Sequence, residues 1–583
     1  MEKKWDLNSL YTGFQGKYLE DIELLKKLIK ERIKEINDNK RDSIIYIESV
    51  IKNDEKITIL IGKLFSFAEL TLSTDIINEE ADKYISIITL IINDSVKAEV
   101  DFQKYIKNVD LEELKKSSDI INNYSFILSK LGKTASHLLS KKEEVLYSKL
   151  RKVCGSSWGK IQEITTSNLL CDVNGESKTL TETRNLAYSA DSKVRKDAYY
   201  AEQKAYKSIE DVVAISLTNI KYESNVLLKL RKYKDPITYN LEENCNMKRE
   251  SLDALMSAIL EFRPVFIKYL KAKAKYLGHK KSLPFYDLFA PLGKSNSTID
   301  FDTACSLVLD SFYSFSPKLG DFAKKAIKNN WIDVYPKKGK VGGAFCANLP
   351  YIRESRVLLN FTGSLDNCLT LAHELGHAYH GEIISDELPL NTNYPMQLAE
   401  TASIFCETIM GKNLISKVTD KEEKIAILEQ SVSDSTQVII DILSRYLFEE
   451  DLYKKANNSL SASKLKSMMI NAQKKAYLDG LDHDILHPYM WICKGHYYSV
   501  DGNFYNFPYA FGLLYGRGLY ASYLKDPEEF LKNYDKMLFL TTHATAEDVT
   551  LSMGIDITKK DFWIDSLKVI EEEINELVVL LEK

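Results

Sequence analysis

Thr370-Leu-Ala-His373-Glu374-Leu-Gly-His377 says most about this chain, because it carries an H-E-x-x-H motif. Residues four apart share one face of a helix, so His373 and His377 can bind one zinc ion together. Glu374 lies one step round the helix, close enough to polarise a zinc-bound water. Glu400, further along the chain, can supply the third ligand from a second helix. Three protein ligands leave the fourth position to water, which is typical of a catalytic zinc site.

Residues other than Glu400 could supply the third ligand. A metzincin would carry H-E-x-x-H-x-x-G-x-x-H, but here His380 and Ile383 occupy the later positions, which excludes that class. His380 shares the face of the motif histidines, yet a straight helix places it far from their ion. We therefore expect it to face substrate or to support a ligand, with a ligand role as the alternative. A helix beginning near Pro395 would present Glu400 and Glu407 on one face. Glu407 is expected to orient a ligand histidine, unless it is a buried carboxylate paired elsewhere.

The composition is that of a globular protein with more than one domain. Of the 583 residues, 45% are hydrophobic and 28% charged, and the formal net charge is −5. Lys and Arg are spread along the chain, so neither nucleic acid nor a membrane is expected as a partner. The first residues lack a signal-peptide core, and the apolar stretch from Tyr84 to Ile92 is too short to span a bilayer. Eight scattered cysteines without a C-x-x-C pair indicate reduced thiols and a cytoplasmic protein.

Helical spacing of apolar residues predicts a mainly α fold. The pattern is clear at Lys17 to Asn37 and at Glu143 to Val153, and it returns from Asp191 to Lys229. Asn174-Gly175 between two short runs predicts a β-hairpin instead. We place a domain boundary near residue 190, which gives an N-terminal helical lobe (1–190) and a catalytic domain (191–583).

A small β-sheet is predicted directly before the H-E-x-x-H helix. Its expected strands are 331–335, 342–346 and 356–361. Gly342 and Gly343, followed by Ala344, would let a peptide backbone approach an edge strand closely. A plain hairpin turn is an equally good interpretation of these glycines.

Four further stretches, together with the zinc motif, resemble the oligoendopeptidase F branch of the thimet oligopeptidase family. They are Trp5-Asp-Leu-Asn-Ser-Leu-Tyr11, Gly339-Lys-Val-Gly-Gly-Ala-Phe345, Gly495-His496-Tyr497-Tyr498 and Phe504-Tyr505-Asn-Phe-Pro-Tyr509-Ala510. The resemblance runs nearly end to end, with the zinc motif its most specific part. It implies a mainly α, two-lobed helical clamshell, with a deep channel that admits only short unfolded peptides and one zinc ion per chain at its floor.

The resemblance also implies roles for individual residues: zinc ligands His373, His377 and Glu400, the general base Glu374, and a far wall with His496, Tyr505 and Tyr509. A Tyr hydroxyl or His N–H aimed at the developing oxyanion stabilises it more in the transition state than in the ground state. We expect Tyr509 first and His496 next in that role, while each could equally be an aromatic of the channel wall. Phe507 and Gly512 stand where other branches can carry Tyr, so the choice among the tyrosines stays open.

These observations predict a zinc-dependent endopeptidase that hydrolyses internal bonds of oligopeptides, with Glu374 acting as general base on zinc-bound water. An exopeptidase in the same cleft is the nearest alternative, and it would need a cation such as Arg353, Arg356 or Arg517 to hold a terminal carboxylate. A catalytically silent peptide-binding protein is the alternative outside enzymes, and the complete set of zinc residues argues against it.

Overall fold

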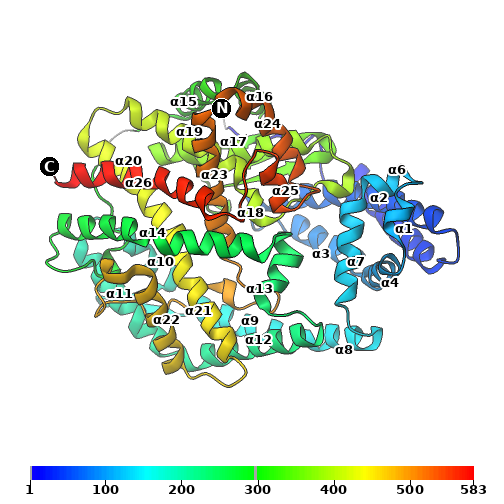
Figure 1. The fold of residues 1–583 in the computed structure, drawn as a ribbon, viewed down its shortest axis with the longest axis horizontal. Helices are drawn as coiled ribbons and strands as arrows, with labels where there is room; N and C mark the ends of the chain where they lie inside the picture. Colours follow the sequence, from blue (N-terminus) through cyan, green and yellow to red (C-terminus); the bar gives the residue numbers. More distant parts are fainter. Residues whose placement is uncertain (1–2, 295–297, 583) are drawn as a thin grey trace. The chain divides into compact units, whose positions relative to one another are not determined.

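The chain folds mainly as α-helix, with one two-stranded and one three-stranded sheet among the residues that the computed structural model describes, 3–294 and 298–582 (Figure 1). The predicted mainly α class is confirmed. The chain forms two compact units, each built from three segments. Unit 1 comprises Met1–Leu138, Ser297–Asn413 and Asp526–Met553; unit 2 comprises Leu139–Asn296, Leu414–Lys525 and Gly554–Lys583.

Unit 1 holds the N-terminal helices, the three-stranded sheet and the helix of the H-E-x-x-H motif. Its helices are α1 (Lys17–Asn37), α2 (Ser43–Thr74), α3 (Glu79–Asn93), α4 (Val96–Lys107), α5 (Leu111–Leu114), α6 (Asp119–Asn123), α7 (Ser125–Ser136), α15 (Phe301–Phe315), α16 (Pro317–Lys328), α17 (Leu365–Ile384), α18 (Met396–Ala399), most of α19 (Thr401–Lys417), α24 (Pro527–Leu540) and α25 (Ala546–Leu551). The range predicted from Lys17 to Asn37 coincides with α1.

Aromatic side chains build the core of the first helices. Tyr11, Phe14 and Tyr18 pack on Phe67 of α2 and Tyr84 of α3, with neighbouring ring centroids 4.9 to 5.7 Å apart. Helix α2 is long and apolar enough to cross a membrane by length and composition alone. This is weak evidence for a membrane span, because a buried core helix passes the same test. Phe67 of α2 belongs to the core cluster.

The three-stranded sheet lies against α17, beside the motif as predicted. Its order is β3-β5-β4, with β3 (Ile332–Asp333) parallel and β4 (Phe345–Leu349) antiparallel to β5 (Glu354–Leu358). Both β4 and β5 contact α17. The strand expected at 342–346 begins only at Phe345, because Gly343 adopts a positive φ of 79° that extended strand does not allow.

Unit 2 contains the predicted hairpin. Strands β1 (Leu170–Val173) and β2 (Glu176–Thr179) pair antiparallel across Asn174-Gly175, where both residues have positive φ. The helices of the unit are α8 (Lys141–Arg151), α9 (Gly155–Ser167), α10 (Leu180–Asn185), α11 (Ser192–Lys207), α12 (Glu210–Leu230), α13 (Pro236–Tyr239), α14 (Arg249–Tyr276), α20 (Lys421–Thr436), α21 (Ile442–Lys455), α22 (Ala462–Tyr477), α23 (Phe507–Lys525) and α26 (Lys560–Glu582).

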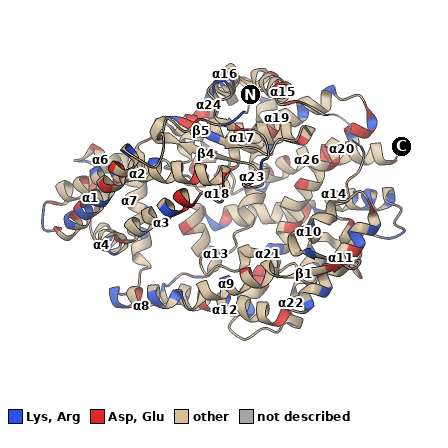
Figure 2. Cartoon of the chain, turned by 180° about the vertical axis from the view of Figure 1, so that it is seen from behind, with Lys and Arg blue, Asp and Glu red and all other residues tan. Residues whose placement is uncertain are grey.

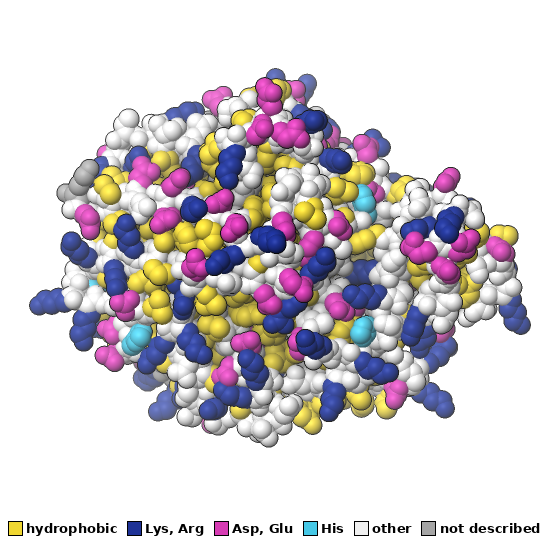
Figure 3. Space-filling view, in the orientation of Figure 1, with side chains coloured by type: hydrophobic (Ala, Val, Ile, Leu, Met, Phe, Trp, Pro, Cys, Tyr) yellow, Lys and Arg dark blue, Asp and Glu magenta, His cyan; other side chains and the backbone are white. Residues whose placement is uncertain are grey.

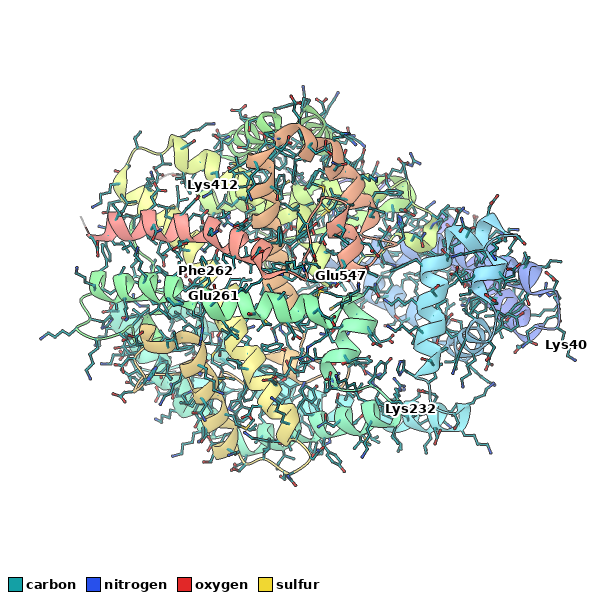
Figure 4. The ribbon with its side chains drawn as sticks, viewed as in Figure 1. Lys40, Lys232, Glu261, Phe262, Lys412 and Glu547 are labelled. Carbon is teal, nitrogen blue, oxygen red and sulfur yellow. The ribbon has the colours of Figure 1, made fainter. Side chains whose placement is uncertain are left out.

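Helix α26 packs along α14 and α23 of unit 2. Glu261, labelled on α14 in Figure 4, forms an ion pair with Lys560 at the start of α26. Elsewhere too, charges of both signs are interspersed along the helices (Figure 2), and the face in Figure 3 shows Lys and Arg mixed with Asp and Glu. These views show no broad stretch of a single sign.

Candidate metal centre

His373, His377 and Glu400 come together in unit 1 as a group that could hold a metal ion. One ligand atom from each residue lies within 4.8 Å of the other two. His373 Nε2 and His377 Nε2 are 3.3 and 3.4 Å from the same carboxylate oxygen, Glu400 Oε2. Both histidines project from α17, one turn apart, so the four-residue spacing places their rings side by side, 4.9 Å between centroids.

Glu400 does not sit within a helix, which differs from the sequence-based prediction. Helix α18 ends at Ala399 and α19 begins at Thr401, so Glu400 is the residue at which the chain turns from one to the other. Ser403 Oγ donates a 2.7 Å hydrogen bond to Glu400 Oε2, which fixes the carboxylate toward α17. Ser403 and Glu407 lie within α19, whereas Glu400 lies just before this helix.

Gly376 allows α17 and α19 to approach closely enough for three ligands to meet. A Cβ at this position would lie 2.6 Å from the Ala402 carbonyl oxygen and 2.7 Å from Ser403 Cα. Both of these are backbone atoms, which a rotamer change cannot move away. A side chain at position 376 would therefore push α19, and Glu400 with it, away from His373 and His377.

Glu407 lies on the far side of His373. Its Oε2 is 2.8 Å from His373 Nδ1, so the carboxylate accepts a hydrogen bond from the Nδ1–H group. Nε2 then points toward Glu400. Burial disfavours the charged imidazole, but hydrogen bonds to Glu400 and Glu407 outweigh this and raise the pKa of His373 to about 10. The carboxylates of Glu400 and Glu407 therefore stabilise positive charge at His373.

The residues fit a zinc ion by their chemistry. Two imidazole nitrogens and one carboxylate oxygen form a donor set that zinc prefers, with a coordination position left over. Glu374 Oε2 is buried and makes no hydrogen bond within the described part of the chain. Burial raises the pKa of Glu374, against the opposing effect of His373 and His377. A buried carboxylate oxygen beside three ligands, without a partner of its own, is suited to act on a molecule that enters the site.

His380 is outside this group. Its side chain is fully buried, its ring stacks on Tyr394 at 4.2 Å, and its Nε2 lies 3.2 Å from the Leu538 carbonyl oxygen and 2.8 Å from Thr541 Oγ1. Burial lowers the pKa of His380 to about 3, so the ring is neutral. It anchors α17 to the end of α24 and neither reaches the surface nor joins the ligand atoms.

Strand β4 is tied to the motif helix through Asn348, a residue that sequence reasoning missed. Its Nδ2 donates to the His377 carbonyl oxygen at 3.3 Å. Gly381 makes room for this side chain, because a Cβ there would lie 2.2 Å from Asn348 Oδ1. Gly342 and Gly343 precede the strand and have open space where a Cβ would stand. In the sheet order β4 is an edge strand.

His496, Tyr505 and Tyr509 belong to unit 2, where they form a cluster of their own. The His496 ring centroid is 4.6 Å from that of Tyr505 and 6.3 Å from that of Tyr509. The side chains of His496 and Tyr505 are exposed. Phe507 and Gly512 are buried in α23, so neither adds a side chain to this surface.

The three arginines considered for an exopeptidase are all engaged. Arg356 is buried and binds the Asp6 carbonyl oxygen and Glu354. Arg517 Nη1 donates to Glu573 Oε1 at 2.8 Å. Arg353 pairs with Asp386 at 2.8 Å on an exposed turn.

Family models and known proteins match most of the chain. The family model described as "Peptidase family M3" matches residues 185–569, and the model described as "Oligopeptidase F" matches residues 106–169. Oligopeptidase PepF of Bacillus subtilis is 24% identical over 604 residues, covering 100% of this chain and 88% of the relative. These matches confirm the resemblance to oligoendopeptidase F.

Solved structures share the fold. A crystal structure from Chlamydophila abortus has a TM-score of 0.83 at 22% identity and covers 99% of this chain and 98% of its own. Oligoendopeptidase-F from Enterococcus faecium has a TM-score of 0.72 at 17% identity and covers 97% and 99%. At these identities the likeness shows the fold alone and says nothing of the chemistry of the site.

Proposed function

Because the chain belongs to peptidase family M3, we propose that it is a zinc endopeptidase that hydrolyses internal bonds of short, unfolded oligopeptides. The observation that carries the proposal is the group of His373, His377 and Glu400 beside the buried carboxylate of Glu374. The names of relatives, such as Oligopeptidase PepF, support oligopeptides as the substrate class. The eight free cysteines support a cytoplasmic location.

The proposed mechanism assigns one task to each residue. Zinc held by His373, His377 and Glu400 would polarise the scissile carbonyl and lower the pKa of water toward neutrality. Glu374 Oε2 takes the proton of the attacking water and returns it to the leaving nitrogen. For the oxyanion we propose a hydrogen bond donated by the Tyr509 hydroxyl, with His496 as the next candidate and Tyr505 as the third.

The edge of β4 would hold the substrate in extended form. Backbone hydrogen bonds to an edge strand do not depend on sequence, so they suit a peptidase of broad specificity. The open space at Gly342 and Gly343 supports close approach of a second backbone.

The first test is cleavage of a quenched peptide of about ten residues, blocked at both ends, with and without a chelator and added zinc. We expect cleavage at an internal bond, its loss with chelator and its return with zinc. Trimming of a free peptide but not of the blocked one would favour the exopeptidase. Bound zinc without cleavage of either peptide would favour a binding protein.

Replacing Glu407 by Ala is expected to weaken zinc binding about 10- to 100-fold, because His373 then loses the acceptor that orients its ring. Competition with a chromophoric chelator measures the dissociation constant. Glu407→Gln keeps an acceptor oxygen and serves as the control, with a smaller loss. Equal affinity of Glu407→Ala and wild type would show that Glu407 does not position the ligand.

A further inference from the structure

A cavity with a volume of about 490 Å³ lies within unit 2. Its lining comes from α10, α11 and α20, from the segment around Phe285, and from the chain between α22 and α23. All of these segments belong to unit 2, and the lining includes none of the three candidate metal ligands. The volume is in the range of pockets that bind small molecules. The side chains of the lining decide which kind of molecule fits.

Lys494 is the cation of this cavity that has no partner. Its side chain is half-buried, and its ammonium makes no hydrogen bond or ion pair with any other described residue. Burial, together with the charges of Arg445 and Arg184, lowers the pKa of Lys494. Charges that are taken out of water are normally paired, because a partner offsets the cost of desolvation. An anion beside the Lys494 ammonium would therefore be stabilised.

The other charged side chains of the lining are exposed or already matched. Asp434 of α20 is exposed to water. Among the described residues three ion pairs account for the rest: Arg184 with Glu202, Arg195 with Asp287, and Glu429 with Lys273. The imidazole of His487 lies against Glu202, with 3.3 Å between Nε2 and Oε2. One positive charge is left over, so the cavity suits a ligand with one negative charge.

Arg184 provides a second cation close to Lys494. Its Nη1 lies 3.1 Å from the Sγ atom of Cys493, the residue that precedes Lys494 in the chain. An anion held by Lys494 can therefore also interact with this guanidinium. A second negative charge on the ligand would instead face the carboxylates of Glu202 and Glu429, which line the same cavity.

Aromatic side chains form another part of the lining. The ring centroids of Tyr188 and Phe289 are 5.1 Å apart, and those of Tyr199 and Tyr286 are 5.8 Å apart. Tyr188 is 61% exposed, so part of this aromatic wall faces solvent. A flat ring packs well against such side chains by offset stacking or edge-to-face contact. The cavity thus combines an aromatic wall with one unmatched cation.

We propose that this cavity binds a small organic acid that carries one carboxylate and one aromatic ring. The carboxylate accepts hydrogen bonds from the Lys494 ammonium, with Arg184 nearby, and the ring packs against Tyr188 and Phe289. Hydrogen bonds between charged groups are the strong ones, which suits a small ligand with few contacts. This is a binding site in addition to the metal centre, and it does not depend on the peptidase activity.

Calorimetric titration of the zinc-loaded protein with 3-phenylpropionate tests the site. We expect a dissociation constant of about 1 mM or lower, and binding at least about tenfold weaker for the neutral 3-phenylpropanamide. The same titration with a chelator present should give the same affinity. Equal binding of acid and amide would overturn the proposal, and so would loss of binding with chelator, because the acid would then be a ligand of the metal.

Lys494→Met removes the charge and keeps most of the side-chain volume. We expect this variant to bind 3-phenylpropionate at least about tenfold more weakly than wild type. Lys474→Met, at an exposed position of α22, makes the same change of charge as a control and should bind like wild type. Equal affinities of the two variants would refute the role of Lys494. If Lys494→Met fails to fold, Tyr188→Ala at its exposed position decides, with an expected loss of about three- to tenfold.

Thermal unfolding without ligand gives a second measure of the unmatched charge. Lys494→Met should be at least as stable as wild type, because it removes a half-buried charge that has no partner. A lower unfolding temperature would show that the protein itself stabilises the ammonium, which would contradict the proposal.

Two further probes define the ligand. Adenosine monophosphate has a ring and two negative charges, so it should bind more weakly than 3-phenylpropionate, and tighter binding would overturn the assignment of a single carboxylate. Phenylalanine differs from 3-phenylpropionate by its ammonium group. Whichever of these two binds more tightly supports the site and identifies its source, a free aromatic amino acid or an aromatic acid without an ammonium group.

Discussion

Glu374→Gln is expected to lower kcat/KM for the blocked peptide by about 10³-fold while the protein keeps its zinc. Positioned general acid–base groups contribute about 10²- to 10⁴-fold, and Glu374 is the carboxylate beside the ligand group that has an oxygen free for this task. The amide has nearly the same volume as the carboxylate, so packing on α17 is preserved. Because Glu374 is not one of the three ligands, metal affinity should change little.

Steady-state kinetics and metal analysis of the same sample measure both effects together. Glu382→Gln is a matched control, because Glu382 lies on the same helix and forms only a partly exposed ion pair with Lys325. It should retain activity close to wild type. If Glu374→Gln kept more than about a tenth of the wild-type rate, Glu374 would not be the general base.

Gly376→Ala should disrupt the metal centre although it adds a single methyl group. The new Cβ would lie 2.6 Å from the Ala402 carbonyl oxygen, so α19 must move away from α17. Overpacking of this kind costs about 1–3 kcal/mol of folding stability. The movement also carries Glu400 away from the histidines, and we expect zinc affinity to fall by at least about tenfold, the loss typical when a ligand is displaced by its surroundings.

Gly411→Ala provides the control within the same pair of helices. A Cβ at Gly411 of α19 would meet only Leu369 Cδ2 of α17, at an ordinary distance of 3.8 Å. This variant should bind zinc like wild type and be at least as stable, since Ala favours helix over Gly. Thermal unfolding and chelator competition measure the two quantities. Equal zinc affinity of the Gly376→Ala and Gly411→Ala variants would refute the packing argument.

The sequence was sufficient for features that depend on local spacing. The His373 and His377 pair follows from the four-residue repeat of a helix, and the hairpin at Asn174-Gly175 follows from the positive φ that both residues tolerate. Glu400, the third candidate ligand, was also predicted from the sequence. Its position between two helices, rather than within one, was not predicted. At that break Ser403 Oγ holds the Glu400 carboxylate, a contact that the spacing of apolar residues does not record.

Features that join distant segments could not be predicted. Asp441 and Arg445 have the spacing of a helical ion pair, but nothing in the sequence connects them with Asn506. Similarly, Asn348 reaches the motif helix only because Gly381 leaves space there. His380 matched the spacing of its neighbouring histidines, yet the packing of α24 against α17 places it in the core.

The alternation of the chain between its two units has a consequence for biosynthesis. Unit 1 includes Asp526–Met553, so it is completed only after this segment has left the ribosome. Until then α17 lacks α24, which supplies Asp535 to Tyr379 and the Leu538 carbonyl oxygen to His380. A nascent or truncated chain therefore carries the zinc-binding residues without the support of their helix. The motif helix therefore acquires its full packing only after Asp526–Met553 has been made, later than all three candidate ligands.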